Sequence, residues 1–234
     1  SYRRSLAIRE ALGAPAPVAQ SLNGIANTVY YLGKYGEAKA LYERSLSLML
    51  QAKDRAGAAI AVNNLAELSN SLGDPANALR GFRESLAMFA ELGDESGAGS
   101  SWIGQGNTHL LLGDYASAAA AYTRSLAMAE RRGERLNTAN ALNNLGVVSR
   151  KLGAWDEALS YYARSLEIKE TLGNRAGVAD TLHNMGLVFR QRGDLDQAME
   201  HYERSLAITR ELGDPAGVAG VLAGMANVHY ERGE

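Results

Sequence analysis

The chain of 234 residues has the composition of an ordinary globular protein, with 46% apolar and 21% charged residues, which argues against long disordered segments. It has no cysteine, which excludes disulfides, thiolate metal sites and cysteine nucleophiles. Its 24 basic and 26 acidic residues give a net charge of −2, which offers no general attraction to nucleic acid or to an anionic membrane. No apolar run approaches the roughly 18–20 residues that span a bilayer, and we expect a cytoplasmic protein.

The sequence repeats itself every 40 residues without insertion or deletion. The triplet Arg4-Ser5-Leu6 recurs at Arg44-Ser45-Leu46, Arg124-Ser125-Leu126, Arg164-Ser165-Leu166 and Arg204-Ser205-Leu206. An aromatic residue recurs at Tyr2, Tyr42, Phe82, Tyr122, Tyr162 and Tyr202, and a small residue at Ala26, Ala66, Gly106, Gly146, Gly186 and Ala226. Columns that stay in register in this way indicate an array of structural repeats.

Each unit is predicted to contain two helices of about 17–18 residues, because its apolar positions are spaced by three and four. Glycine is predicted to end the helices. We expect Asp74, Asp114, Asp194 and Asp214 to cap the helices that follow, with Pro75 and Pro215 at the first helical position. In chain order, the pattern predicts the second helix of a truncated repeat over residues 1–12, helix pairs over approximately 15–52, 55–92, 95–132, 135–172 and 175–212, and the first helix of a further repeat over 215–234.

A single helix pair of this kind cannot bury both of its faces, so neighbouring pairs must stack. The small column allows two helix backbones to approach closely, and the aromatic column fills the space beside it. The sequence therefore predicts an all-α solenoid of antiparallel helix pairs.

The fifth unit carries a family resemblance in Leu182, Gly186, Phe189, Ala198 and Tyr202, with Gly193-Asp194-Leu195 between them. In this order they resemble the tetratricopeptide repeat (TPR), and the resemblance covers the whole chain. It implies a right-handed superhelix. The period of 40 instead of 34 and the absent proline after the second helix are departures, and they are similar to the longer repeats of kinesin light chains, Pins-like polarity adaptors and bacterial signalling proteins.

The chain starts and stops within a unit, which suggests a piece of a longer array. The apolar faces of uncapped terminal helices can stack against another copy. We therefore expect end-to-end self-association as an additional property.

Catalytic and metal-binding patterns are weak. The histidines, His109, His183, His201 and His229, have no ligand spacing on one helix. The glycine-rich stretch 97–106 lacks the Gly-Lys-Ser/Thr of a phosphate loop and lies in a predicted helix. We expect no enzyme activity, no cofactor and no metal.

The resemblance implies that the first helix of each unit lines a concave groove. One groove row holds Asn23, Asn63, Asn143 and His183, with Asn64, Asn144 and Asn184 beside it, and the next holds Asn27, Glu67, Asn107 and Asn227. Asparagine is a poor residue for the middle of a helix, and its amide can both donate to and accept from the main chain of an extended peptide. The alternative is an amide that bridges to the adjacent helix or loop.

A further groove row changes character along the chain and contains Tyr30, Leu110, Arg150, Lys151 and Arg190. The three basic residues suit an acidic or carboxylate-bearing segment, with an apolar anchor near Leu110 and Trp102. The alternative is a solvated helix end. Asn23 stands where the clamp for chaperone C-termini requires a lysine, so chaperone tails are not the expected ligand.

These patterns favour a non-catalytic protein-interaction scaffold that binds a protein or peptide in its groove, with neither nucleic acid nor membrane as a partner. The resemblance and the Ala-, Arg- and Gly-rich composition suggest the sensor or adaptor part of a larger bacterial signalling protein. Two alternatives stay open, namely an intramolecular regulatory domain that controls an attached effector domain, and a self-associating solenoid.

Overall fold

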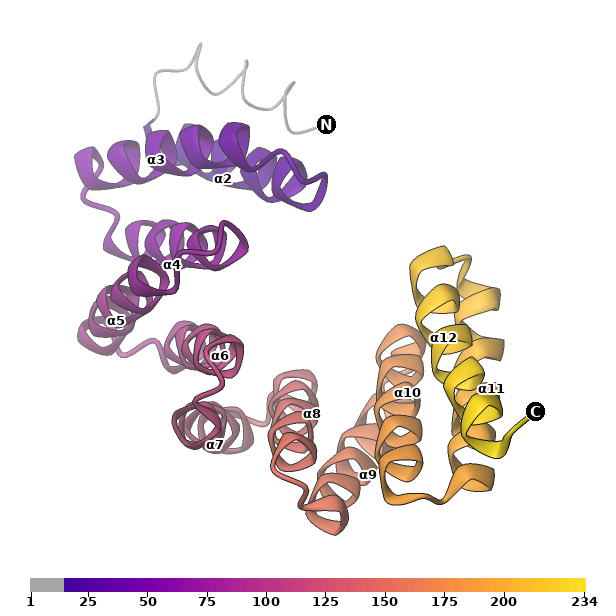
Figure 1. The fold of residues 1–234 in the computed structure, drawn as a ribbon. Helices are drawn as coiled ribbons and strands as arrows, with labels where there is room; N and C mark the ends of the chain where they lie inside the picture. The colour runs from indigo at the N-terminus through magenta and orange to yellow at the C-terminus, as the bar shows by residue number, and fades with distance from the viewer. Residues whose placement is uncertain (1–14) are drawn as a thin grey trace. The chain divides into compact units, whose positions relative to one another are not determined.

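The computed structural model describes residues 15–234, which form helices and no strand (Figure 1). The helices are α2 (Pro15–Tyr31), α3 (Tyr35–Gln51), α4 (Arg55–Ser71), α5 (Pro75–Leu92), α6 (Glu95–Leu111), α7 (Tyr115–Arg132), α8 (Arg135–Lys151), α9 (Trp155–Thr171), α10 (Arg175–Arg192), α11 (Leu195–Leu212) and α12 (Pro215–Arg232). The helix expected over residues 1–12 lies outside the described residues. The described part is an all-α solenoid of helix-pair repeats, which confirms the predicted fold class.

Glycines with positive φ end the helices, as at Gly93 with φ 67° and Gly213 with φ 65°. Lys53 occupies the same phase of the repeat and adopts a left-handed φ of 56° without being a glycine. Most helices begin at an acidic or amide cap, and the Asp74 side chain accepts from the Asn77 N–H at 3.1 Å. Asp194 accepts no such bond.

Asp194 was expected to cap α11, and that expectation was wrong for a local reason. The Asp194 carboxylate instead pairs with the guanidinium of Arg192, the last residue of α10. An arginine two residues before the cap therefore draws the side chain away from the backbone N–H groups. Pro75 and Pro215 do stand at the first positions of α5 and α12.

Aromatic rings pack against glycines in the helix pairs α6–α7, α8–α9 and α10–α11. The side chains of Tyr162 and Tyr202 are completely buried. A Cβ atom at Gly146 would lie 2.6 Å from the Tyr162 ring, and one at Gly186 would lie 2.6 Å from the Tyr202 ring. The ring therefore occupies the volume that any larger residue in the first helix would need, which is the role predicted for the small column.

The recurring serine also belongs to the interior. Ser45 is fully buried, and its hydroxyl donates to the carbonyl oxygen of Ala19 at 2.8 Å. Ser165 and Ser205 make the same bond to carbonyls 26 residues earlier, at 2.7 and 2.8 Å. A hydroxyl used in this way ties the two helices of a repeat together.

The described chain divides into two compact units, residues 15–128 and residues 129–234. In the first unit α4 contacts both α2 and α6, and in the second α10 contacts both α8 and α12 (Figure 1). The first helices of consecutive repeats therefore lie side by side within each unit. We call the surface that they present the first-helix face of that unit. No helix of the described part combines the length and apolar character needed to cross a membrane.

Candidate functional site

Asparagines on the first-helix face join neighbouring repeats. In the first unit Asn64 Nδ2 donates to Asn23 Oδ1 at 3.1 Å, and the Ser101 hydroxyl donates to Asn63 Oδ1 at 3.0 Å. Both pairs connect first helices of adjacent repeats, because their members are 41 and 38 residues apart. These amides are all half-buried. The bonds occupy the carbonyl oxygens of Asn23 and Asn63 and leave their NH₂ groups for other partners.

The second unit repeats this arrangement. Asn143 Oδ1 accepts from Asn184 Nδ2 and from the Thr181 hydroxyl, both at 3.4 Å. Asn144 is also half-buried, but neither it nor the exposed Asn140 one turn earlier makes a side-chain hydrogen bond to the described residues. The face therefore carries amides that bridge repeats next to amides with unused donors and acceptors.

The groove row that contains Asn27 and Asn107 is hydrogen-bonded to tyrosines of the recurring aromatic column. The hydroxyls of Tyr42 and Tyr122 donate to Asn27 Oδ1 at 2.6 Å and to Asn107 Oδ1 at 2.8 Å. Burial raises the pKa of Tyr42 to about 12, and burial likewise raises the pKa of Tyr122. These tyrosines therefore stay protonated and able to donate over the physiological range. Asn227 is exposed on α12.

Glu67 takes the place of the asparagine in the second repeat. The aromatic residue there is Phe82, which has no hydroxyl to donate. The Glu67 side chain is half-buried on α4, and burial raises the pKa of its carboxyl group. Glu67 forms no ion pair within the part of the chain that the structure describes. A carboxylate without a cation thus lies on the first-helix face of the first unit.

The groove row that contains Tyr30, Arg150 and Arg190 also forms side-chain bonds between neighbouring repeats. Tyr30 and Ser71 share a hydrogen bond of 2.7 Å, and the Arg190 guanidinium forms an ion pair with Glu231 at 2.5 Å. Arg150 donates to the neutral amide oxygen of Gln191 at 3.3 Å. Of the three basic residues considered as carboxylate anchors, Arg190 is therefore already neutralised. Arg150 and the exposed Lys151 have no carboxylate partner among the described residues.

The expected apolar anchor is only partly available. Leu110 is half-buried on the first-helix face. Trp102, expected mainly in the core, is also half-buried, and the Arg124 guanidinium lies 4.4 Å from the centroid of its ring. The arginine side chain thus shields the indole, because a guanidinium stacks favourably on an aromatic face.

Lys169 is a polar feature that the sequence reasoning missed. Its side chain is 3% exposed, and its Nζ donates to the Thr181 hydroxyl at 2.9 Å. Burial lowers the pKa of Lys169, while the nearby carboxylate of Asp180 opposes this shift. The equivalent residues of the first two repeats are Met49 and Phe89, so a lysine in an otherwise apolar column was the available signal.

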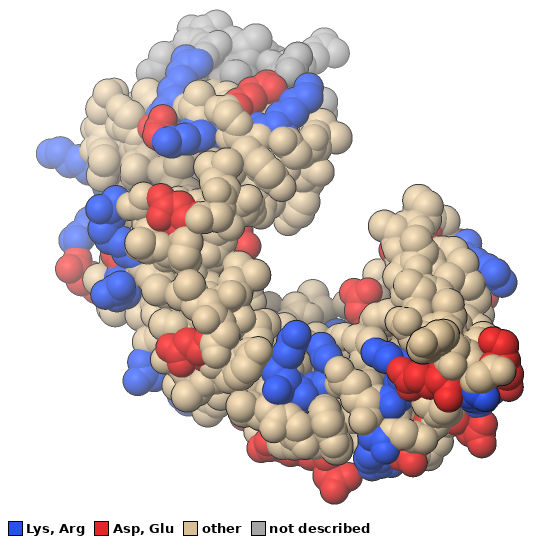
Figure 2. Space-filling view, viewed as in Figure 1, with Lys and Arg blue, Asp and Glu red and all other residues tan. Residues whose placement is uncertain are grey.

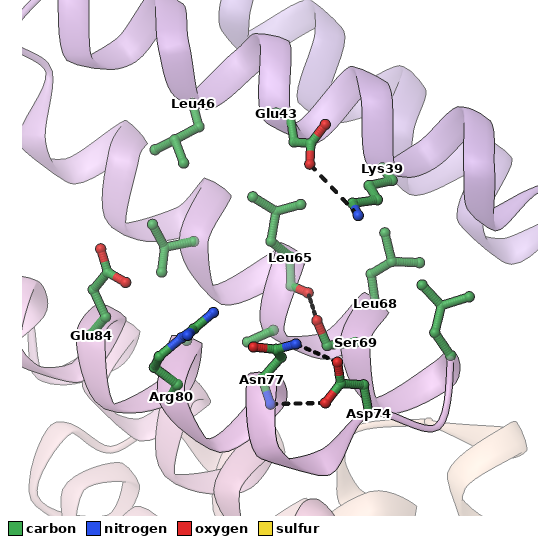
Figure 3. Close-up of a pocket in the computed structure, with 14 residues that line it drawn as sticks. Lys39, Glu43, Leu46, Leu65, Leu68, Ser69, Asp74, Asn77, Arg80 and Glu84 are labelled. Carbon is green, nitrogen blue, oxygen red and sulfur yellow. Dashed lines mark hydrogen bonds and ion pairs between the residues drawn. The ribbon is translucent and has the colours of Figure 1, made fainter.

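A pocket of about 500 Å³ lies elsewhere, between α3 and α5 above α4 (Figure 3). Leu65 and Leu68 line its centre, with Lys39 and Glu43 on the α3 side and Arg80 on the α5 side. Lys39 and Glu43 form a loose ion pair at 3.9 Å. Charges of both signs line this pocket, so it has no clear preference for an anion or a cation.

Surface charge gives no sign of a nucleic-acid interface on the visible side. Figure 2 shows Lys and Arg side chains close to Asp and Glu side chains in each unit, and neither kind forms a continuous stripe. Some ion pairs join the two helices of one repeat, as between Arg55 and Glu91 and between Arg175 and Glu211. Exposed pairs of this kind contribute little to stability.

Sequence comparison assigns the chain to a family. Models of the tetratricopeptide repeat match residues 57–131 and 137–211, and another model of the same repeat matches residues 18–52. These matches cover well over half of the chain, which belongs to the tetratricopeptide repeat family. No curated protein matches the sequence.

Solved structures share the fold. BtubC (BKLC) from P. vanneervenii has a TM-score of 0.76 and 22% identity, with 91% of this chain and 90% of that chain covered. Aspartyl phosphate phosphatase F from Bacillus subtilis has a TM-score of 0.76 and 15% identity, covering 92% and 57%. A Rap protein complexed with competence and sporulation factor has a TM-score of 0.77 and 14% identity, covering 97% and 71%. The fold is typically that of a non-catalytic scaffold for protein interactions, and this chain has that architecture.

Proposed function

We propose that the first-helix face of each unit binds an extended peptide segment of a partner protein. The observation that carries this proposal is that each bridging asparagine uses its carbonyl oxygen within the protein and keeps its NH₂ group free of described partners. Asn23, Asn63 and Asn143 use their carbonyl oxygens to bridge repeats, and their NH₂ groups make no bond to the described residues. A fixed amide that still has donors can bind peptide carbonyl groups with little loss of side-chain entropy.

The bridges make such a face suitable for recognition. An amide held by its neighbour is already in one orientation, so binding does not have to order it. Main-chain contacts of this kind tolerate many sequences, and selectivity then comes from the other residues of the face. Extended peptide segments are commonly recognised in this way, with affinity from main-chain hydrogen bonds and selectivity from side-chain contacts.

The comparisons support a role in signalling. The Rap protein named above was solved in a complex with competence and sporulation factor. A signal transduction ATPase from Pyrococcus horikoshii with a TM-score of 0.73 and 15% identity is described as having a tetratricopeptide repeat sensor, and 34% of that chain is covered. A sensor or adaptor role in a larger signalling protein is the corresponding proposal for this chain.

The proposal is tested by selection from a random peptide library, followed by affinity measurements on variants. The face variant is Asn63→Ala with Asn143→Ala, which removes from each unit one amide NH₂ group that is free of described partners, and alanine favours the helix. The matched control is Ser160→Ala with Gln197→Ala, which changes two exposed residues of second helices α9 and α11. Circular dichroism checks that both variants fold.

The selected peptides should bind the parent and the control equally and the face variant several-fold more weakly. Equal binding to all three proteins would contradict the proposal. Recognition would then belong to another surface, such as the pocket between α3 and α5.

A further inference from the structure

Tyrosine hydroxyls of the aromatic column have different partners in the two units. In the first unit Tyr42 and Tyr122 donate to asparagines of their own repeats. In the second unit the positions of those asparagines hold Val147 and Leu187, which cannot accept. The hydroxyls of Tyr162 and Tyr202 accordingly have no hydrogen-bond partner in the described part of the chain, although both side chains are 0% exposed.

Buried polar atoms without hydrogen-bond partners are uncommon in folded proteins and require an explanation. In the second unit, several of these atoms belong to the arginines of α8 and α10 and to residues near them. The Nε atoms of Arg150 and Arg190 and the Nδ1 atom of His183 are also buried and lack partners in the described chain. The His183 ring lies 5.5 Å from the Tyr202 ring, measured between centroids.

Each of these arginines lies within electrostatic reach of a buried tyrosine. Burial raises the pKa of Tyr162 to about 12, and the guanidinium of Arg150 opposes that rise. Burial also raises the pKa of Tyr202, with Arg190 and Arg150 opposing it. Arg150 therefore lies within electrostatic reach of both tyrosines, although its geometry toward Tyr162 falls short of a regular hydrogen bond.

Among the described residues, only one of the two arginines has a counter-charge. Arg190 is paired with Glu231 at 2.5 Å, whereas Arg150 at the equivalent position one repeat earlier has the neutral Gln191 at 3.3 Å. Arg150 also opposes protonation of His183, whose pKa is lowered mainly by burial. A half-buried guanidinium without a counter-charge has donors available for an approaching carboxylate.

We propose that Arg150 is the subsite that recognises an acidic side chain of the bound peptide. This inference rests on the proposed peptide-binding function and deepens it. Val147 and Leu187 are half-buried on the same face, so the ligand class is a peptide in which a Glu or Asp stands beside an aliphatic residue. The carboxylate forms a charge-assisted pair with Arg150, in the way that Glu231 pairs with Arg190.

The test uses three versions of one acetylated and amidated peptide whose centre is Leu-Glu-Leu, Leu-Gln-Leu or Leu-Lys-Leu. Their affinities for the full chain are measured by fluorescence anisotropy. The Glu peptide should bind about tenfold more tightly than the Gln peptide, and the Lys peptide most weakly. Arg150→Gln should abolish the preference for Glu over Gln.

A further variant separates recognition from general charge. Lys151→Gln removes an adjacent exposed charge and should leave the preference intact. The Nε–Hε resonance of Arg150 gives a direct spectroscopic readout and should shift only with the Glu peptide.

Equal affinity for the Glu and Gln peptides, or a preference that survives Arg150→Gln, would overturn the Arg150 subsite while leaving peptide binding in place. An equal loss of preference with Lys151→Gln would overturn it as well, because general electrostatic attraction would then explain the data. Failure of every peptide to bind would reject both the subsite and the proposed function.

Discussion

Asn64 donates from Nδ2 to Oδ1 of Asn23 at 3.1 Å, and this bond joins two first helices across 41 residues of sequence. Asn184 and Asn143 make the equivalent bond at 3.4 Å in the second unit. Bridging between repeats and binding of a peptide were alternative explanations of the asparagines. The geometry makes them compatible, because a bridge uses one edge of the amide and leaves the other edge for a ligand.

Lys53→Gly is expected to stabilise the protein by about 1 kcal/mol. Lys53 has a φ of 56°, in the phase of the repeat where Gly93 has a φ of 67°. A left-handed conformation costs an L-residue roughly 1–2 kcal/mol that glycine does not incur. Urea unfolding measures the change. Gly93→Lys is the reciprocal control and should destabilise, and a loss of stability in Lys53→Gly would contradict the account.

Gly146→Ala is expected to destabilise the second unit by about 1–3 kcal/mol, because the new Cβ would meet the completely buried Tyr162 ring at 2.6 Å. Gly220 on α12 is the matched control, since nothing lies within 4 Å of its Cβ position. Gly220→Ala should stabilise by about 1 kcal/mol through helix propensity alone. Thermal unfolding compares the two variants, and equal effects would mean that the ring does not fix this contact.

Lys169→Met is expected to raise stability at neutral pH by about 1 kcal/mol, because it removes a buried charge from a column that holds Met49 in the first repeat. The pKa of Lys169 is lowered by burial, so the parent gains stability as pH rises toward the ordinary lysine pKa of 10.5. The advantage of the variant should therefore shrink with rising pH. Chemical unfolding of both proteins across this range would show a constant difference if the lysine were not buried in solution.

Alkaline pH is expected to unfold the protein through its buried tyrosines. Burial raises the pKa of Tyr42 and Tyr162 from 10.0 to about 12. The folded protein therefore holds these protons where the unfolded chain loses them, and the stability present below pH 10 is lost between about pH 10 and pH 12. Melting temperature should fall across this window, less steeply in Tyr162→Phe. Buried tyrosines that titrate at their ordinary pKa, followed by tyrosinate absorbance, would contradict this expectation.

Much of the fold could be predicted because the repeat enforces the same local solution many times. Helix lengths, glycine ends and the packing of Gly146 on Tyr162 all follow from columns that are visible in the sequence. The departure of Asp194 from its capping role was not predictable from its own column, because it depends on Arg192 nearby. A repeat pattern averages over units and does not show what one neighbour does to one side chain.

The candidate site was predictable as a set of positions but not as a set of interactions. The asparagine rows were identified from poor helix propensity, whereas the bridge from Ser101 to Asn63 requires the relative placement of two helices. The pairing of Arg190 with Glu231, and its absence at Arg150, likewise depends on which residue stands 41 positions later. The sequence does not show that residues 41 positions apart lie side by side, because that depends on how the repeats stack.

The most direct test of peptide recognition on the first-helix face is to map a selected peptide by amide chemical-shift changes in the labelled chain. The account predicts that the largest changes fall on α8, α10 and α12, or on α2, α4 and α6, and include the side-chain NH₂ groups of Asn143 or Asn63. Changes concentrated on α9 and α11, or around the pocket between α3 and α5, would contradict it.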